Sequence, residues 1–394
     1  MSERLRVAVY DLYWSTLGGG EQVDATIAQV LAADHDVTLL GPEPVDVEAT
    51  RARLGVDLTG CDFRRVTDDD VAGTVSADFD VFVNGTYLSR VASEAALSYY
   101  YVHFPRAPRS LREHTRHYAG VAGVKALSLP PQLPHRLGQV QAGFDRRVER
   151  VEFLSTYDRF LANSAFTASW TRRLWGVDAD VVHPPVRPSV APGEKRPLIL
   201  VLGRFFDPSY GHSKKQLELV DTFARLHRSG RLPGWELAVV GGCDATNREY
   251  ALAVKRAARG LPITVRVNAP GDEVERLLGE ATLYWHAAGF GEDERRHPER
   301  FEHFGIAVVE AMAAGAVPFV HGRAGPTEIV RPGIDGMHWE TLDELAEHTV
   351  QLANDESRRD ELAGSAVERA SEYSAANFED QIRSLVAEDR SDTQ

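Results

Sequence analysis

Two short apolar segments, each followed by alternating strand-like and helix-like segments, constrain the fold of this chain more than any other feature. Residues 5–12 and 197–203 each have the length and composition of a buried β-strand. The alternation that follows them is typical of βαβ units in a parallel sheet. A chain of 394 residues is also too long for one ordinary core. We therefore predict an α/β protein with two Rossmann-like parallel-sheet domains that face each other across a cleft.

A stretch rich in proline and glycine, residues 183–193, predicts the linker between these domains. We place the first domain at residues 1–185, the linker at 186–194 and the second domain at 195–374. Residues 375–394 include a last amphipathic helix, whose docking site stays open on the residues alone. The remaining strands are expected at 36–40, 80–84, 97–104, 160–163, 236–241, 263–268, 282–287 and 317–321.

Charge and cysteine content argue against several classes of protein. The net charge of −14 disfavours general nucleic-acid binding, which requires a basic face. Cys61 and Cys243 are far apart and fit neither a disulfide framework nor a zinc pattern. No apolar run approaches the roughly 18 residues that span a bilayer. Because the first strand begins close to residue 5, we also expect no signal peptide. The expected location is the cytoplasm.

Residues 106–150 carry the opposite charge, with nine arginines and lysines against three acidic residues. Two interpretations stay open. The segment is either a solvated helical face or a contact surface for an anionic acceptor or lipid headgroups, with Arg109, Arg112 and Arg116 as candidate contacts. In the second case the protein would lie peripherally on the inner face of an anionic membrane.

The strongest chemical signal is a pair of carboxylates, Glu302 and Glu310, on either side of a Phe-Gly step. Gly305 permits a tight turn, and a short helix is expected to follow it. The start of a helix offers free N–H groups and the positive end of its dipole, which together suit a diphosphate. A glutamate in so apolar a helix requires a binding partner. The residues assigned to this site are Phe304, Gly305, Ile306, Ala307 and Glu310.

This segment resembles the E-x7-E element of the retaining glycosyltransferases of family 4, which have the GT-B fold. Other elements resemble that family in the same order along nearly the whole chain. They are the G-G-x-E loop at Gly18-Gly19-Gly20-Glu21, the A-N-S element at Ala162-Asn163-Ser164, the G-R…K segment at Gly203-Arg204 and Lys214, the E-I-V stretch at Glu328-Ile329-Val330, and the terminal helix after Tyr373-Ser374, which in this family returns to the first domain.

The resemblance implies a retaining hexosyltransferase that needs neither metal nor cofactor, with a nucleotide sugar as its substrate. The segments Glu302-His-Phe-Gly-Ile and Tyr101-Val-His-Phe-Pro are most similar to those of the mannosyltransferases that extend lipid-linked oligosaccharides, one branch of this family. That branch implies GDP-mannose as donor and a lipid-linked or otherwise anionic glycan as acceptor. The alternatives are a UDP-sugar transferase with a small soluble acceptor and a nucleotide-sugar epimerase of the same fold.

The resemblance also implies residue roles. Arg204 and Lys214 would stabilise the leaving diphosphate, because fixed positive charge lowers the barrier where negative charge develops. Glu302 would lie beside the sugar and Glu310 would bind the ribose. His103, at the end of an aromatic strand, would reach the sugar from the first domain, although a core histidine bound to backbone stays an alternative. Gly18, Gly19 and Gly203 are assigned to donor binding, and no catalytic nucleophile is assigned.

The chain departs from the family pattern in two places. The gap between Arg204 and Lys214 is longer than usual, which makes Lys215 a rival for the lysine role. A charged insertion, residues 291–300, precedes Glu302 and could gate or narrow the donor pocket.

Functions of other classes fit the sequence less well. A nicotinamide-dependent dehydrogenase would need a further glycine after the loop at Gly18. A metal-dependent transferase would need a D-x-D site, but Asp78-Phe79-Asp80 only precedes a strand. A binding protein without catalysis is disfavoured because all the charged positions of the family pattern are present.

Overall fold

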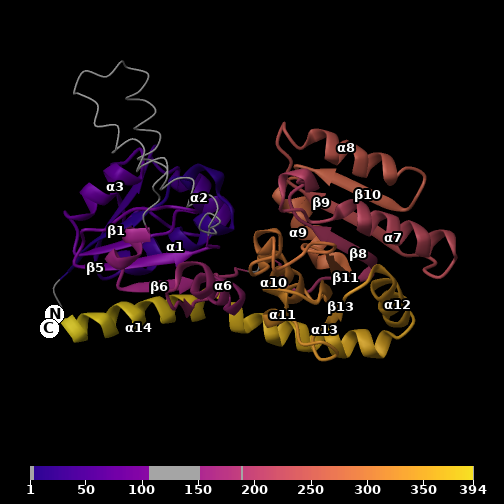
Figure 1. Ribbon diagram of the computed structural model, residues 1–394. Coiled ribbons are helices and arrows are strands. Elements are labelled where there is room, and N and C mark those ends of the chain that lie inside the picture. The colour runs from indigo at the N-terminus through magenta and orange to yellow at the C-terminus, as the bar shows by residue number, and fades with distance from the viewer. Residues whose placement is uncertain (1–3, 106–150, 188–189, 394) are drawn as a thin grey trace, which may run out of the picture.

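The computed structural model describes residues 4–105, 151–187 and 190–393, and these residues form two parallel β-sheets with helices packed against them (Figure 1). The first sheet has seven strands in the order β3-β2-β1-β4-β5-β6-β7, and the second has six in the order β10-β9-β8-β11-β12-β13. The prediction of two Rossmann-like parallel sheets is confirmed. The boundaries at residues 185, 194 and 374 stay predictions, because strand membership alone does not define a domain.

The N-terminal half contains the strands of the first sheet and the helices around them. Its strands are β1 (Arg6–Tyr10), β2 (Asp36–Gly41), β3 (Asp62–Arg65), β4 (Val81–Asn84), β5 (Leu97–Val102), β6 (Arg159–Ala162) and β7 (Asp180–Val181). Its α-helices are α1 (Gly19–Ala32), α2 (Val47–Leu54), α3 (Asp69–Ser76) and α6 (Ala165–Trp175).

The C-terminal half repeats this arrangement with longer connections. Its strands are β8 (Arg196–Leu202), β9 (Glu236–Gly241), β10 (Ile263–Val267), β11 (Ala281–His286), β12 (Val317–His321) and β13 (Met337–Trp339). Its α-helices are α7 (Gln216–Arg228), α8 (Arg248–Ala257), α9 (Gly271–Glu280), α10 (Ile306–Ala313), α11 (Pro326–Ile329), α12 (Leu342–Ala353) and α13 (Glu356–Ala370), after which α14 (Ala375–Thr393) ends the described chain.

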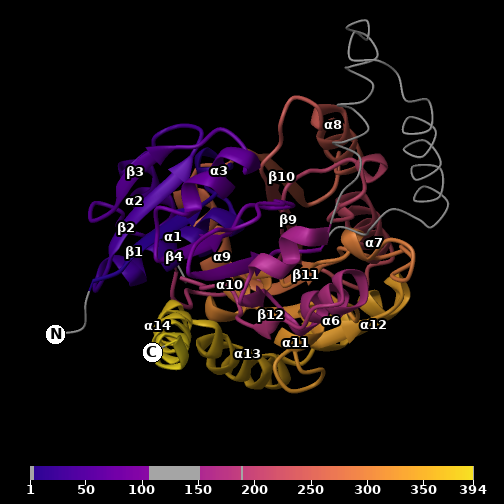
Figure 2. The same ribbon diagram turned by 60° about the vertical axis from the view of Figure 1, so that its left-hand side comes forward.

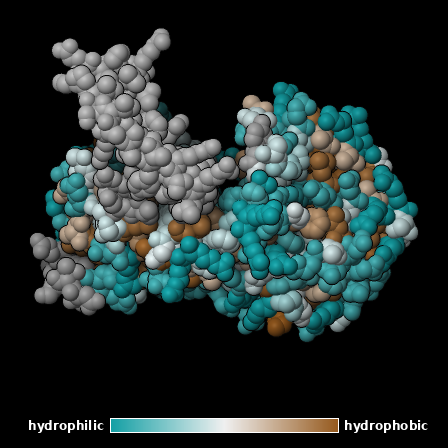
Figure 3. All heavy atoms as spheres, viewed as in Figure 1, coloured by the Kyte–Doolittle hydropathy of each residue, from teal (hydrophilic) through white to brown (hydrophobic). Residues whose placement is uncertain are grey.

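The central strands are buried on both faces, which is why they read as continuous apolar runs. Residues 7–10 of β1 and all of β12 are buried. Helices cover both faces of each sheet, so the apolar residues lie inside. The face of the C-terminal half seen in Figure 3 is accordingly mainly hydrophilic, with hydrophobic residues scattered over it.

In both sheets the strand order reverses beside the first strand, and this position locates the binding site. β1 pairs in parallel with β2 on one side and β4 on the other, while β8 pairs with β9 and β11. Ligands of open α/β sheets bind outside the carboxyl ends of the strands at such a reversal. The ends of β1 and β4 in one half, and of β8 and β11 in the other, are therefore the expected walls of a binding cleft.

The last helix, α14, returns to the N-terminal half and packs against α1 (Figures 1 and 2). Its apolar residues Phe378, Ile382 and Val386 join the core formed by β1, β2 and α1. Where the chain crosses back, Val186 and Ser374 form an isolated parallel bridge. The residues alone did not predict where this helix docks. The family resemblance implied a return to the first domain, and the helix packs there.

Three strands are not predicted by the sequence pattern, because they are short or exposed. β7 has two residues and β13 has three, which is too few for a periodic pattern. β3 has four residues and none is buried, so its sequence carries no apolar signal. All three are edge strands, where burial imposes little on composition.

Candidate functional site

A cleft of about 690 Å³ lies between the two halves, at the carboxyl ends of the strands beside both reversals. The wall from the N-terminal half includes the Gly18–Gly20 loop, Gly85 after β4 and His103 after β5. The facing wall includes Gly203 and Arg204 after β8, His286 at the end of β11, and the start of α10. The cleft is therefore built where the strand order predicts it.

The start of α10 faces the cleft with unsatisfied backbone N–H groups. Gly305, its N-cap, has φ 119°, a conformation that side-chain-bearing residues rarely adopt. The amides of Ile306 and Ala307 have no hydrogen-bond partner among the described residues, and both residues line the cleft. Gly19 approaches from the other half so closely that a Cβ there would lie 2.8 Å from Ile306 Cδ1. Free amides at a helix start suit an anionic group.

Glu302 is held by two donors on one of its two oxygens. Its Oε2 contacts the ammonium of Lys214 and lies 2.8 Å from Nε2 of His286. Burial raises the pKa of Glu302, but the charge of Lys214 and the bond to His286 outweigh it and hold that pKa well below its ordinary value. Glu302 is therefore ionised. Its Oε1 has no partner among the described residues and can accept a bond from a ligand.

His286 orients Glu302 and was not among the residues expected from the sequence. It is 5% exposed, and its Nδ1 is buried without a hydrogen-bond partner in the described part of the chain. Burial lowers its pKa, so the ring is neutral near pH 7 and carries its proton on Nε2, facing the carboxylate. Its place at the end of β11, directly beside the reversal, is the signal that would have identified it.

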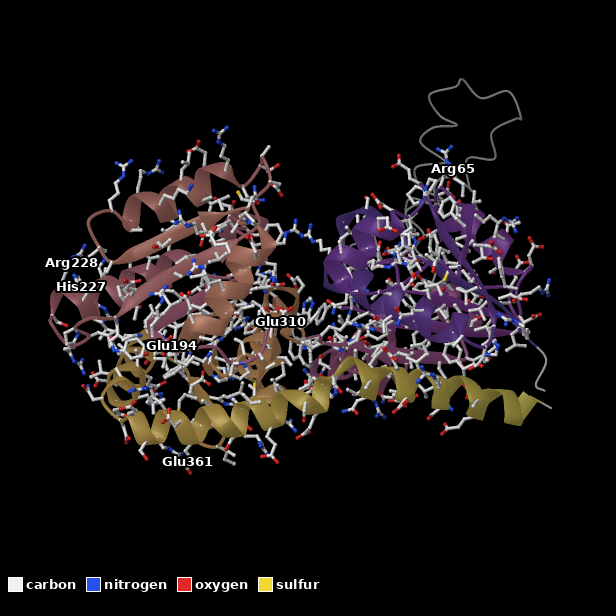
Figure 4. All side chains as sticks on the ribbon, turned by 180° about the vertical axis from the view of Figure 1, so that it is seen from behind. Arg65, Glu194, His227, Arg228, Glu310 and Glu361 are labelled. Carbon is white, nitrogen blue, oxygen red and sulfur yellow. The ribbon has the colours of Figure 1, made fainter. Side chains whose placement is uncertain are left out.

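Glu310 lies on the first turns of α10, on the side of the C-terminal half that faces the N-terminal half (Figure 4). Its carboxylate has no hydrogen bond or ion pair among the described residues. Burial raises its pKa to about 7. A cleft-lining carboxylate without a protein partner suits a ligand that offers hydroxyl donors.

The two adjacent lysines have different surroundings. Lys214 lines the cleft, and its stem crosses Gly203 so tightly that a Cβ there would lie 2.8 Å from Lys214 Cγ. Lys215 does not line the cleft, is 6% exposed, and binds Glu292 at 2.6 Å. The geometry therefore favours Lys214 over Lys215 for the lysine role, and it explains why Gly203 has no side chain.

Arg204 lies at the same edge but is exposed. Its guanidinium lies 4.6 Å from the ring centroid of Phe206, a cation–π distance, and its residue lines the cleft. In this position the guanidinium has no ion-pair partner among the described residues. It remains available to an anionic ligand.

His103 faces the cleft from the N-terminal half with a defined tautomer. Its Nε2 lies 2.9 Å from the carbonyl oxygen of Gly85 and must donate to it. Burial lowers the pKa of His103, so the ring is neutral and Nδ1 carries a lone pair. The ring is bound to backbone, as the alternative expected, and it also lines the cleft, while its contact with a sugar stays a prediction. Gly18 is the N-cap of α1, and its amide donates to the carboxylate of Glu21 at 2.6 Å.

Beside the cleft, the two halves are joined by contacts that the motifs alone did not reveal. The carboxylate of Glu328 accepts the amides of Ala165 and Phe166 at 2.7 and 2.8 Å, capping the start of α6. The hydroxyl of Ser164 donates to the carbonyl of His303 at 2.6 Å. The A-N-S element and the E-I-V stretch, which are far apart in sequence, therefore meet at one interface.

Some expectations cannot be compared with the structure. Arg109, Arg112 and Arg116 lie outside the described residues, as does the whole basic segment. In the described part of the chain, His, Cys, Asp and Glu form no group of three suited to a metal ion. No helix of that part is both long and apolar enough to cross a membrane.

Comparison with known proteins supports the family expected from the motifs. Residues 184–369 match the family model of the glycosyl transferases group 1. A GDP-Man:Man(3)GlcNAc(2)-PP-Dol alpha-1,2-mannosyltransferase of Dictyostelium discoideum is 27% identical over 242 residues, 56% of this chain and 45% of that protein. The human protein of the same name is 28% identical over 57% of this chain and 47% of its own length. This chain thus spans about half the length of these relatives.

Solved structures share the fold over nearly the whole chain. Anabaena Alr3699/HepE in complex with UDP superposes with a TM-score of 0.68 at 15% identity, covering 97% of this chain and 100% of its own. Sucrose-phosphate synthase from Thermosynechococcus elongatus gives 0.67 at 15% identity, covering 98% and 99%. These likenesses establish the architecture, and the sequence matches confirm the resemblance to the branch named above.

Proposed function

Because residues 184–369 carry the domain of the group 1 glycosyl transferases within a GT-B fold, we propose that the protein transfers a hexose from a nucleotide sugar to an acceptor hydroxyl with retention of configuration. The proposed donor is GDP-mannose and the proposed acceptor a lipid-linked or otherwise anionic glycan. Two mannosyltransferases of that donor class among the relatives support this choice.

One observation carries the proposal: Glu302 is held by Lys214 and His286 directly before the free amides of α10. Breaking the anomeric C–O bond leaves an oxocarbenium-like sugar and a diphosphate on which negative charge accumulates. Lys214, Arg204 and the start of α10 would stabilise that charge without reorganisation. The free Oε1 of Glu302 would accept a bond from a sugar hydroxyl and so place the anomeric carbon.

The proton of the acceptor hydroxyl needs a destination. We assign it to the departing diphosphate oxygen, as in the family that the chain resembles, and assign no nucleophile to the protein. His103 would bind the sugar through its Nδ1 lone pair from the opposite wall. Such a reaction needs no metal ion from the protein.

The acceptor side of the cleft offers one cation within the described residues. Arg53 of α2 lines the N-terminal wall, and no ion pair or hydrogen bond holds its guanidinium in the described part of the chain. A phosphate-bearing acceptor would pair with it, and the basic segment at residues 106–150 would add to that attraction.

Ligand-induced stabilisation tests the donor assignment. GDP, UDP and ADP, each alone and as its hexose conjugate, are screened by thermal unfolding. A ligand at 100 times its Kd stabilises the folded state by about 2.7 kcal/mol. We expect GDP and GDP-mannose to raise Tm most. A rise with UDP ligands alone would support the alternative donor, and no rise with any nucleotide would contradict the proposal. The anomeric configuration of the product, read by NMR, tests retention.

Vesicle binding tests the acceptor assignment. Vesicles with anionic lipid should bind the protein and release it in high salt, because exposed charges are screened beyond a Debye length of about 8 Å at physiological ionic strength. Replacing Arg109, Arg112 and Arg116 together with Ser should abolish vesicle binding and leave nucleotide binding unchanged. If the wild type ignores anionic vesicles at low salt, a small soluble acceptor becomes the better assignment.

A further inference from the structure

The two departures from the family pattern contact each other. The long loop, residues 205–213, leads into Lys214 and Lys215, and the insertion, residues 291–300, leads into Glu302. Glu292 of the insertion binds Lys215, and a Cβ on Gly211 of the loop would lie 3.9 Å from Nε of Arg300. Neither segment contributes a strand to the sheet, so the contact between them requires another explanation.

The insertion is anchored at both ends rather than free. Just before it, Gly289 has φ 86°, and a Cβ there would lie 2.3 Å from the ring of Phe301, which follows the insertion directly. Phe301 is 2% exposed and packs with Phe104 and Phe166 of the other half. A short 3-10 turn, Pro298–Arg300, precedes it. A segment fixed in this way can hold a neighbouring side chain in place.

Glu292 makes the contact from the insertion to the lysine pair. Its Oε1 accepts Nζ of Lys215 at 2.6 Å and its Oε2 accepts Nη1 of Arg300 at 2.9 Å. The side chains of Lys215 and Glu292 are only 8% and 12% exposed. Burial raises the pKa of Glu292, but Lys215 and Arg300 outweigh it and keep that pKa below its ordinary value. The ion pair is therefore charged and largely shielded from water.

The backbone at Lys215 makes this pair consequential for Lys214. Lys215 has φ 55° and ψ 40°, the left-handed conformation that side-chain-bearing residues seldom adopt. This conformation turns the chain between two consecutive lysines and sends their side chains to different partners, Glu302 for Lys214 and Glu292 for Lys215. Without Glu292, a buried ammonium would have no counter-charge, and the strained backbone would lose the contact that holds it.

We propose that Glu292 and Lys215 are positioning residues: the insertion holds Lys215 away from the cleft, and this fixes the neighbouring Lys214 on Glu302 in the donor site. The catalytic part of this inference rests on the proposed function. Its structural part rests only on the ion pair between Glu292 and Lys215. The insertion is thus a rigid support of the donor site and not a gate. Neither Glu292 nor Lys215 touches the cleft.

A spectroscopic experiment tests the structural part without any activity. The chain has five lysines (Lys125, Lys195, Lys214, Lys215 and Lys255), so protein labelled with 13C at lysine Cε gives five signals. Single Lys→Arg variants assign them. Glu292→Gln should shift the signals of both Lys215 and Lys214. A shift of Lys215 alone would overturn the inference.

Controls keep this result interpretable. Glu294→Gln changes the same insertion at a carboxylate that has no ion pair among the described residues, and it should move neither signal. If Glu292→Gln does not fold, Glu292→Asp keeps the charge and shortens its reach by one methylene. It should still move the Lys214 signal, and an unmoved signal there would again overturn the inference.

Kinetics test the catalytic part. Glu292→Gln should lower kcat for sugar transfer about tenfold or more, because a small misplacement of a positioned group is costly, while the Kd of bare GDP changes little. In a Lys214→Ala background the same change should have no further effect on kcat. If Glu292→Gln lowers kcat by the same factor in the Lys214→Ala background as in the wild type, the inference is overturned. If no nucleotide sugar is a donor at all, the proposed function fails, and the lysine signals still decide the positioning role.

Discussion

The two walls of the cleft differ in how their polar groups are held. On the C-terminal wall, Lys214 and Glu302 form a partly buried charged contact, and the start of α10 has free amides. On the N-terminal wall, His103 is neutral and bound to backbone, and Gly18–Gly20 bring main chain rather than side chains. The family model covers residues 184–369, so it includes only the charged wall. The difference teaches that the C-terminal half has a chemical signature, whereas the N-terminal half is identified mainly by its position.

The largest expected effect comes from the charged wall. Lys214→Ala and Arg204→Ala should each lower kcat by about 10²-fold or more with the fold intact, because each removes fixed positive charge from the leaving diphosphate. The measurement is steady-state transfer from GDP-mannose, with circular dichroism to check folding. Lys255→Ala, at an exposed position of α8, is the matched control and should leave kcat unchanged. If Lys214→Ala is silent too, the wall does not stabilise a leaving group.

The two glutamates on the same wall should separate binding from turnover. Glu302→Gln should lower kcat strongly while the Kd of bare nucleotide changes little, since its free oxygen serves the sugar. Glu310→Gln should weaken bare nucleotide itself by about tenfold, the value of a charge-assisted bond of roughly 1.5 kcal/mol. Calorimetry with GDP and transfer kinetics measure the two. Equal loss of GDP affinity in both variants would contradict these separate roles.

Titration of Glu310 should give the wild type a pH-dependent affinity. Its pKa is raised to about 7 by burial, and the carboxylate accepts bonds from ribose hydroxyls more strongly than the neutral acid does. GDP affinity should therefore rise about tenfold between pH 6 and pH 8, and Glu310→Gln should remove that rise. The same shift acts on stability with the opposite sign. A carboxyl whose pKa is raised on folding destabilises the fold as pH rises from its unfolded value through about 7. Glu310→Gln should thus raise Tm more at pH 8 than at pH 5, and equal gains at both would argue against the raised pKa.

The smallest effect is expected at His103, on the N-terminal wall. His103→Gln keeps a donor for the Gly85 carbonyl but loses the ring, and it should lower kcat by about tenfold with GDP affinity unchanged. Transfer kinetics measure kcat, and calorimetry with GDP on the same preparation measures the affinity. A loss of Tm with kcat unaltered would make His103 a purely structural residue, and the contrast between the walls would become sharper still.

The sequence identified most of this arrangement wherever the chemistry is local. Gly305, Glu302 and Glu310 lie within nine residues, and the helix start they share follows from that spacing. His286 escaped because it lies sixteen residues before Glu302, and only the order of strands brings the two together. Glu328 was placed in a motif, yet its function as a cap for α6 depends on a contact across 163 positions. Contacts of this range come from topology, which short motifs do not encode.

The return of α14 to the N-terminal half affects the order in which the two halves can complete their folding during synthesis. Phe378, Ile382 and Val386 complete the core of the N-terminal half, and Tyr99 donates a hydrogen bond to Asp389 at 2.7 Å. During synthesis the N-terminal half emerges from the ribosome first but lacks this last packing partner until residues 375–393 have followed. The half made first therefore reaches its final core last, after the C-terminal half has all its strands. A nascent chain would hold its N-terminal half as an incompletely covered domain throughout translation, exposed to chaperones and proteases for as long as that takes.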